Sequence, residues 1–367
     1  MSAARISSEG AGETSRWLRR GLLAVAALAA SASKCLGTQA PDAGPCSERY
    51  GTVSWTSAKF PAGENLSALW VSDGWPASMS ISGNPSEVWA VSDEGHIFGL
   101  GPFAEFFKLF DAQTPLHAVW GSSTGEVWVV GDGGAMLRWR SPNPTTQWEA
   151  VPSGVTTRLS ALGGTGADDV WAAGDDAVLL HWSGTAWAVV APSNVPAGVG
   201  FSSLWVAGAD DVWLSSTEAG ILYRYASGAW TTVDLALALA LRALAGTSPS
   251  DGWVVGDKGF IAHWDGVRWA PVQGSSTANL HGVWAGAPSA AWAVGDEGTT
   301  EFFDGLRWFS ISSRSTQQLR CVGGGFASRT GTGTSLTADG RVVSTWAGGT
   351  ASATLAFSQA TLWVCQE

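Results

Sequence analysis

A tryptophan-centred phrase that returns about every forty residues is the strongest constraint on the fold of this 367-residue chain. Two of its copies read EVWVVGDGGAMLRW from Glu126 and DGWVVGDKGFIAHW from Asp251. The anchor tryptophans are separated by 39, 43, 42, 40 and 39 residues, and they are Trp89, Trp128, Trp171, Trp213, Trp253 and Trp292. A repeat of this length made of short strands is typical of β-propellers, which use four strands per blade.

Each repeat divides into four predicted strands. An apolar leading strand, such as 116–120 or 280–284, precedes the strand that carries the anchor tryptophan. A Gly-Asp-x-Gly turn, whose Gly and Asp we expect to supply positive φ angles, joins it to a third strand such as 260–264. The fourth strand carries a closing tryptophan, and these are Trp148, Trp187, Trp230, Trp269 and Trp308. Nineteen of the 23 tryptophans occupy repeated positions of this kind, so blade packing explains most of the excess.

The ends of the repeat array predict a seventh, degenerate blade and a closed ring. Leu319–Val322 matches a leading strand, and Ser335–Val343 matches an anchor strand, turn and third strand without the anchor tryptophan. Trp55 aligns with the closing tryptophans, so the N-terminal strand completes the last blade in this interpretation. The final segment, Thr361–Cys365, competes for the same position. We therefore expect an all-β propeller of seven four-stranded blades over residues 50–367, with the segment 235–245 as strand and edge.

The composite phrase VWAVGDxGxIxHWDGxxW resembles the repeats of Trp-rich propeller families. The nearest are tectonin-type lectin repeats and the Asp-box-like repeats of photosystem-assembly and bacterial surface propellers. Ile221–Trp230 (ILYRYASGAW) looks most like a tectonin repeat, whereas Ser335–Trp346 looks more like a chromosome-condensation-regulator repeat. The resemblance covers about residues 50–350 and implies a propeller. Because propellers host many unrelated activities, it does not by itself imply one function.

The N-terminal segment has the order of an export signal. Arginines at 16, 19 and 20 precede an apolar stretch, 21–30, and small residues follow. We expect residues 1–35 to be a signal peptide and residues 36–49 a linker or tether. Cys35 lies where a bacterial lipoprotein carries its lipidated cysteine, but Lys34 departs from the lipobox pattern. The sequence is therefore compatible with a lipid-anchored form and with a freely secreted form. The predicted location is the outer membrane or cell surface, the periplasm or the extracellular space.

The four cysteines suit an oxidising compartment. Cys46 and Cys365 flank the predicted folded region, so a disulfide between them would join its ends. Cys321 is expected to be a small core residue. A zinc site is not expected, because the sequence has no CxxC pair.

Charge excludes some partners. The chain has 20 basic and 31 acidic residues, and without residues 1–35 it has 15 and 29, a net charge of −14. Such a chain does not neutralise phosphates, so a nucleic-acid partner is not expected. Membrane association is expected only through the lipid anchor, and the protein is expected to be a monomer.

Recurring aspartates in the turn after the anchor strand are the first candidate ligand-binding residues. They form a predicted ring on one face that could bind cations, although turn carboxylates also accept nearby backbone N–H bonds. Asp339 falls in the matching turn of the degenerate unit. The histidines at 96, 117, 181, 263 and 281 occupy repeat positions and are interpreted as packed or strand-surface residues. The ring consists of Asp93, Asp132, Asp175, Asp257 and Asp296.

The first blade departs from the repeat and supplies the second candidate. A long insert, 71–86, contains the out-of-register Trp75, and a Phe-rich stretch follows. Exposed aromatic residues mark binding sites and stack on sugars, whereas buried ones fill a local core. The sequence does not choose between a binding site and a local core for this region. Its phenylalanines are Phe98, Phe103, Phe106, Phe107 and Phe110.

Catalytic signatures are absent from the sequence. It contains no GxSxG, HExxH or P-loop, and the arginine triad and tyrosine nucleophile of a sialidase have no recognisable counterparts. No cofactor or metal is expected. The sequence favours a non-catalytic scaffold that binds a protein on a propeller face or on the blade-one insert. The alternatives are a tectonin-like lectin that binds glycans and a propeller-scaffold glycan hydrolase or lyase.

Overall fold

The computed structural model describes one compact unit within Gly51–Val364. The described residues are 55–58, 61, 64–71, 88–100, 106–122, 125–140, 148–190, 193–313, 315–327, 341–349 and 355–362, and for 55–58, 100, 325–327, 341–349 and 355–362 the description is of the backbone. Within this part of the chain, no helix is both long and apolar enough to span a membrane. The predictions for six residues cannot be compared with the structure, because Cys35, Cys46, Trp75, Phe103, Asp339 and Cys365 lie outside the described residues.

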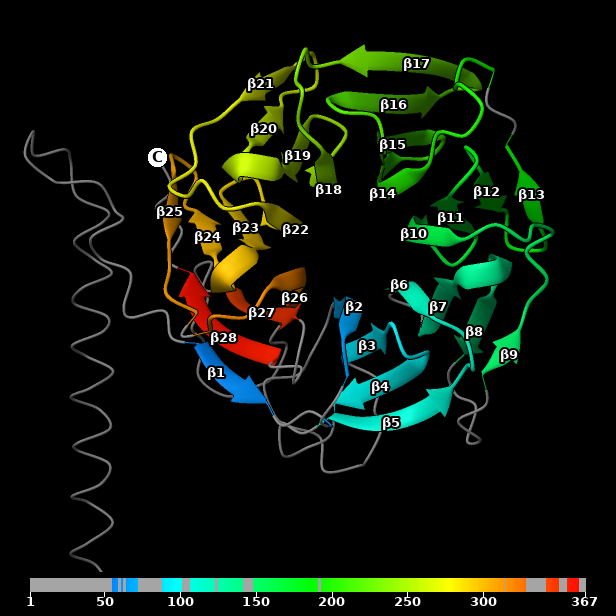
Figure 1. Cartoon of the computed structure of the whole chain (residues 1–367), viewed down its shortest axis with the longest axis horizontal. Coiled ribbons are helices and arrows are strands. Elements are labelled where there is room, and N and C mark those ends of the chain that lie inside the picture. The colour runs from blue at the N-terminus through cyan, green and yellow to red at the C-terminus, as the bar shows by residue number, and fades with distance from the viewer. Residues whose placement is uncertain are drawn as a thin grey trace, which may run out of the picture. The chain divides into compact units, whose positions relative to one another are not determined.

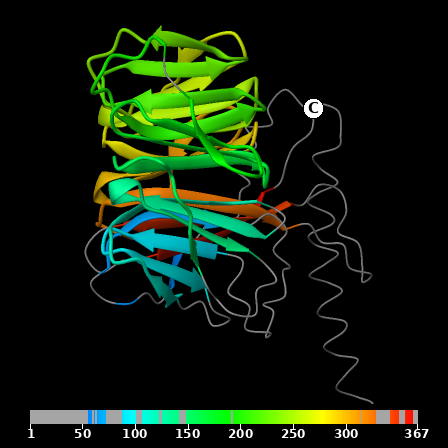
Figure 2. The same cartoon turned by 90° about the vertical axis from the view of Figure 1, so that its right-hand side faces the viewer.

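The fold is an all-β propeller whose blades are sheets of four antiparallel strands. Figure 1 shows the sheets arranged around a common centre with the first strand of each blade innermost. Figure 2, turned by 90°, shows the strands running between the two faces of this ring. The repeat period therefore predicted the architecture correctly.

Six blades are formed by consecutive strands, as the sequence repeats predict. The first three blades consist of β2 (Leu66–Val71), β3 (Val88–Ser92), β4 (His96–Leu100), β5 (Phe106–Asp111); β6 (Leu116–Gly121), β7 (Glu126–Gly131), β8 (Met136–Arg140), β9 (Glu149–Ala150); and β10 (Leu159–Gly166), β11 (Asp169–Gly174), β12 (Leu179–Trp182), β13 (Trp187–Val189). The next three consist of β14 (Phe201–Gly208), β15 (Asp211–Ser216), β16 (Ile221–Ala226), β17 (Ala229–Asp234); β18 (Leu241–Ser248), β19 (Asp251–Gly256), β20 (Ile261–Trp264), β21 (Trp269–Pro271); and β22 (Leu280–Ala287), β23 (Ala290–Gly295), β24 (Thr300–Phe303), β25 (Trp308–Ser310).

The anchor tryptophans hold neighbouring blades together. All six are at most 1% exposed, as expected for structural residues. Trp128 of blade 2 lies 5.1 Å from Trp182 and 5.2 Å from Trp187, both of blade 3, between ring centroids. Trp213 of blade 4 makes the same contacts with Trp264 and Trp269 of blade 5. Because such aromatic pairs add about 0.5–1.5 kcal/mol each beyond the area they bury, the tryptophan repeat stabilises each blade-to-blade contact.

A second repeated contact joins the anchor tryptophan to an acid–base pair in the same blade. In blade 5, His263 Nε2 lies 2.7 Å from Asp251 Oδ1, and the imidazole packs on Trp253 with 4.4 Å between centroids. Asp169, His181 and Trp171 repeat this arrangement in blade 3, where the two rings stack at 4.0 Å. The interpretation of His181 and His263 as packed residues is thus confirmed.

Two blades use arginine in place of this histidine. Arg138 pairs with Glu126 at 2.5 Å, and its guanidinium lies 4.8 Å from the Trp128 ring and 4.9 Å from the Trp182 ring. Arg224 pairs with Asp211 at 2.8 Å and lies 5.0 Å from the Trp213 ring. The base is therefore held between an acid of its own blade and aromatic rings at a blade contact.

A further four-stranded sheet contains both ends of the array, and we call it the terminal sheet. Its order is β1-β28-β27-β26, with β26 (Leu319–Ala327), β27 (Arg341–Gly349), β28 (Leu355–Leu362) and β1 (Trp55–Ala58). β26 packs against β22 on one side and β2 on the other.

The prediction for residues 335–343 was wrong at residues 341–343, while residues 335–340 lie outside the described ranges. Residues 341–343 begin the second strand, β27, rather than forming a third strand, because β27 pairs with both β26 and β28. Trp346 lies opposite Gly323, in the register where Trp292 lies opposite Trp284. Trp346 therefore occupies the register position of an anchor tryptophan, which the forty-residue period missed because 54 residues separate it from Trp292.

The structure shows which end of the chain supplies the outermost strand of the terminal sheet. β28, which ends at Leu362, is the third strand, and β1 pairs with its outer side. Trp55 lies opposite Ser358, matching the register of Trp308 opposite Phe303 in blade 6. β28, which includes Thr361 and Leu362 of the final segment, and the N-terminal strand β1 thus occupy successive positions in one sheet.

Two other segments differ in part from expectation. Residues 235–240 connect strands and 241–245 belong to the inner strand β18, so this segment is not an edge strand. Phe98 and Phe106 are buried in the blade-one core, whereas Phe107 is 38% exposed. Core filling therefore explains Phe98 and Phe106. Cys321 lies in the same core cluster, as predicted.

Candidate functional site

The aspartate turns lie at the end of each blade where the inner strand begins. The backbone N–H of Asp132 donates to the carbonyl of Pro115, which directly precedes the inner strand β6. The N–H of Asp257 donates likewise to Ala240, and that of Asp296 to Asn279. We call this end of the ring, formed by these turns and the segments entering the inner strands, the turn face.

The conformation of these turns differs from the prediction in one respect. In four of the five turns the two residues after the aspartate have positive φ angles, for example Lys258 (φ 55°) and Gly259 (φ 68°) in the 3₁₀ turn η3 (Asp257–Gly259), whereas after Asp93 only Gly95 does. A Cβ at Gly259 would lie 2.0 Å from the carbonyl oxygen of Ser276, so glycine is required there. Two related 3₁₀ turns are η2 (Asp132–Gly134) and η4 (Asp296–Gly298). The aspartate side chain is consequently available for other contacts.

Four of the five predicted aspartates contact a nitrogen-bearing side chain from an inner strand. The remaining one, Asp175, is exposed, and no Arg, Lys or His within the described ranges pairs with it. The structure thus brings these aspartates to one face, but it surrounds most of them with bases rather than leaving a ring of unpaired carboxylates. The four contacts are Asp93–Arg320 at 2.6 Å, Asp132–His117 at 2.7 Å, Asp257–Arg242 at 2.6 Å and Asp296–His281 at 2.7 Å.

The bases come from one equivalent position, the second residue of the inner strand. Three blades have serine there instead, and each serine hydroxyl donates to a carbonyl on the next inner strand. His117 and His281 share this position in the repeat, but their repetition alone does not mark it as a site. The sequence does contain a pattern that indicates these pairs, because the base and its aspartate are 15 residues apart in three blades. The position is occupied by Ser67, His117, Ser160, Ser202, Arg242, His281 and Arg320.

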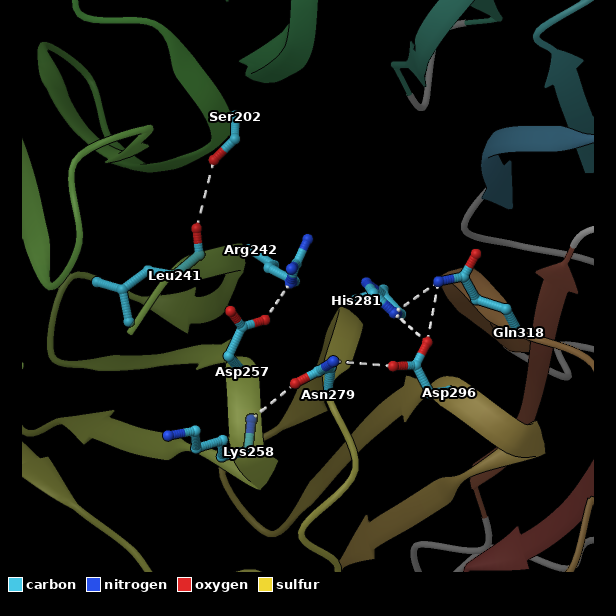
Figure 3. A network of polar contacts seen from close by, with 9 residues as sticks. All are labelled: Ser202, Leu241, Arg242, Asp257, Lys258, Asn279, His281, Asp296 and Gln318. Atoms are coloured by element: carbon cyan, nitrogen blue, oxygen red, sulfur yellow. Dashed lines mark hydrogen bonds and ion pairs between the residues drawn. The ribbon is translucent and has the colours of Figure 1, made fainter. Parts of the chain in front are cut away.

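Asp296, in the turn η4, is the centre of a polar network that joins the starts of two inner strands, β22 and β26 (Figure 3). Its carboxylate accepts hydrogen bonds from Asn279 Nδ2 at 2.9 Å and Gln318 Nε2 at 2.9 Å, in addition to His281. Burial opposes ionisation of Asp296, but these hydrogen bonds outweigh it, and the pKa of the carboxyl is lowered. The carboxylate is therefore ionised at neutral pH and fixes the side chains around it.

Charges of both signs surround this network on the turn face. Glu94, Asp176 and Glu297 are exposed carboxylates at the turn tips. Exposed cations are Lys258, in the blade-five turn, and Arg158, whose Nε lies 3.9 Å from Asp132 Oδ1. In the described part of the chain, no group of three or more His, Cys, Asp or Glu residues is arranged to hold a metal ion.

The five turn aspartates, as ligand-binding residues, stay a prediction. Trp75 as a ligand residue, Cys35 as a lipidation site and the Cys46–Cys365 disulfide cannot be placed, because all four residues lie outside the described ranges.

Many solved structures match this chain, and the three described next are 9–12% identical to it. The WD40 repeats of RRP9 superpose with a TM-score of 0.65 at 9% identity, over 85% of this chain and 99% of that one. Catalytically inactive H270A virginiamycin B lyase from Staphylococcus aureus, with quinupristin, gives 0.63 at 10% identity over 83% and 99%. YCF48 bound to D1 peptide gives 0.61 at 12% identity over 84% and 97%. At these identities the similarity shows the propeller fold alone.

No protein-family model and no curated protein matches this chain.

Proposed function

We propose that this chain is a non-catalytic interaction module that binds a segment of another protein on its turn face. The observation that carries the proposal is the repeated pairing of inner-strand bases with turn carboxylates around one face of the ring. This pairing presents donors and acceptors in fixed positions, which lowers the entropic cost of binding a flexible segment. The neighbour YCF48, described with a bound D1 peptide, supports the use of such a scaffold for peptides.

The chemistry of the turn face suits a protein segment better than other ligands. A peptide offers backbone donors and acceptors together with side chains of either charge, and the turn face offers both signs within one surface. The net charge of −11 disfavours nucleic acid. His281 and His117 are each paired with an aspartate, as a catalytic base often is. In the described residues neither histidine has a hydroxyl or thiol partner that it could activate as a nucleophile, so the proposal includes no catalysis.

Site-specific photo-crosslinking in the source cells tests this proposal. A photo-reactive residue at Glu297 samples the turn face, and one at Val267, which is 83% exposed in the hairpin at the other end of blade 5, is the matched control. We expect one discrete protein adduct from position 297 and none of the same mass from position 267. Equal adducts from both positions, or none from 297, would contradict the proposal. Glycan-array binding lost in Trp75→Ala would replace it with the lectin, and turnover of a glycan would replace it with an enzyme.

We also propose that the terminal sheet is the seventh blade and that β1 closes the ring. The registers of Trp346 and Trp55, which match those of blade 6, support this. Closure removes two sheet edges that would otherwise template aggregation. Deletion of residues 51–58 should lower the unfolding midpoint and increase aggregation, whereas an unchanged midpoint would contradict closure by β1.

Export completes the proposal and rests on the sequence pattern. Residues 1–35 act as a signal peptide, residues 36–49 tether the propeller, and Cys35 carries a lipid at the outer membrane or cell surface. Metabolic labelling with a lipid probe tests the anchor. Label in the wild type that is lost in Cys35→Ser supports it, and secretion of unlabelled protein supports the freely secreted form.

A further inference from the structure

Three successive inner strands carry nitrogen-bearing side chains at the equivalent second position. They are Arg242 on β18, His281 on β22 and Arg320 on β26, and each of these strands packs against the next. The inner strands on the other side carry serine at this position in blades 3 and 4, Ser160 and Ser202. We call Arg242, His281 and Arg320 the inner arc.

Each guanidinium in the inner arc is held by a turn aspartate through only part of its donors. Asp257 accepts from Arg242 Nε at 2.6 Å, and within the described residues neither terminal nitrogen of Arg242 has a partner. Asp93 accepts from Arg320 Nη1, and Gln318 lies 3.5 Å from Arg320 Nε, which leaves Nη2 without a partner in the same part of the chain. The side chains of Arg242 and Arg320 are 39% and 35% exposed, so these donors are accessible.

The orientation of the inner arc is visible in the structure. Figure 3 shows Arg242 and His281 projecting from neighbouring inner strands toward the centre of the ring, with Asp257 and Asp296 behind them. A carboxylate that holds Nε positions the two Nη groups as a planar fork, which matches the two oxygens of a second carboxylate. Arg242 and His281 therefore point toward the centre, while the exposed carboxylates Glu297 and Glu94 lie at the turn tips.

We propose that the inner arc is a carboxylate-binding subsite of the turn face, which takes an acidic side chain or the C-terminal carboxylate of a bound protein segment. The proposal rests on the proposed function and names the chemistry of the partner at the centre of the face. It differs from a ring of carboxylates that attracts cations, because the residues nearest the centre are donors. The turn aspartates then act as positioning residues for these donors rather than as ligands.

Histidine NMR provides a direct assay, because the chain has five histidines and all five are described. Sodium acetate serves as the probe at constant pH, with sodium chloride at equal ionic strength as the control. His281, identified by loss of its signal in His281→Gln, should shift saturably with acetate. His181 and His263, packed on anchor tryptophans, should not shift, and their signals also report that each variant is folded.

Two variants and a matched control decide the assignment. Arg242→Gln and Arg320→Gln should together weaken acetate binding at least tenfold, whereas Arg158→Gln, the same charge change on the same face outside the inner arc, should leave it within twofold. Inorganic phosphate is the second arm, and a response to phosphate stronger than that to acetate would overturn the carboxylate assignment. An acetate shift that is unsaturable, or equally strong in the double variant, would overturn the proposal.

Peptides then distinguish the source of the carboxylate and separate this inference from the proposed function. Peptides with a free C-terminus and their amidated forms, with and without internal Glu, compete with acetate. Loss of competition on amidation assigns the C-terminal carboxylate, and dependence on Glu assigns a side chain. If position 297 crosslinks a partner equally in wild type and Arg242→Gln/Arg320→Gln, the subsite fails while the binding function stands. If acetate binds the inner arc but position 297 crosslinks no protein, the proposed protein-binding function fails while the carboxylate subsite stands.

Discussion

His–carboxylate pairs occur at both ends of the propeller, and the difference between them lies in what else each imidazole touches. At one end, His263 is bonded to Asp251 and its ring packs on the buried Trp253. On the turn face, His281 is bonded to Asp296, whose carboxylate also accepts from Asn279 and Gln318 at the starts of the inner strands β22 and β26. The same pair is therefore a packing element in one place and part of a polar surface in the other. Repetition of a residue pair does not by itself define its role.

The largest expected effect follows from removing an anchor tryptophan. Trp253→Ala should lower the free energy of unfolding by about 3–5 kcal/mol, because it leaves a cavity where Trp253 meets His263, Phe303 and Trp308. Urea denaturation followed by circular dichroism measures it. A loss below about 1 kcal/mol would contradict the role of this contact between blades.

The buried ion pair of blade 2 should come next. Arg138→Ala removes the base from a site where Arg138 and Glu126 are 7% and 8% exposed, so it leaves Glu126 as an unpaired buried acid. We expect a loss of about 3 kcal/mol. Arg138→Met is the control, since it keeps apolar contact with Trp128 and Trp182 while removing the charge. If Arg138→Met is as stable as the wild type, aromatic packing rather than the ion pair holds this position.

A pH profile tests the contribution of the packed pair Asp251–His263. Burial opposes ionisation of Asp251, but hydrogen bonds from His263 and Thr247 outweigh it and lower the pKa of Asp251 below 3.8. A carboxyl with a lowered folded-state pKa contributes stability above its unfolded pKa and loses it as pH falls through the folded value. The stability difference between wild type and Asp251→Asn should thus be constant from pH 7 to about 5 and shrink below pH 4. A difference that persists at pH 2 would contradict this origin.

The smallest effect on stability is expected from the inner arc. Arg242→Gln should change the free energy of unfolding by less than about 0.5 kcal/mol, because this ion pair is partly exposed. The same variant should weaken acetate binding, as measured by the His281 signal. A large loss of stability would identify Arg242 as a structural residue and remove the contrast between the two ends.

Much of the fold could be predicted from the sequence because blade packing demands the same residue at the same position in each repeat. The anchor tryptophans and the turn aspartates were found this way. Trp346 was missed, since a longer connection between β26 and β27 breaks the period although the strand register is kept. Trp346 was therefore missed because of its spacing from the other anchor tryptophans and not because the residue type differs.

The inner arc could not be predicted in the same way, because its position varies among Ser, His and Arg. A search for a constant residue overlooks it, while the separation of 15 residues between base and aspartate would have indicated it. Arg320 escapes even that signal, since its partner Asp93 lies 227 residues away, on the first blade. Only the arrangement of the sheets brings these two side chains together.

The stabilities of two matched variants, Asp251→Asn and Asp296→Asn, test most directly the claim that the two kinds of pair differ in role. Asp251 is 9% exposed, and we expect its variant to lose about 1–3 kcal/mol of unfolding free energy while retaining acetate binding. Asp296 is 31% exposed, and its variant should lose about 1 kcal/mol or less while acetate binding at the inner arc falls. Equal losses of stability, with acetate binding unchanged in Asp296→Asn, would contradict the account.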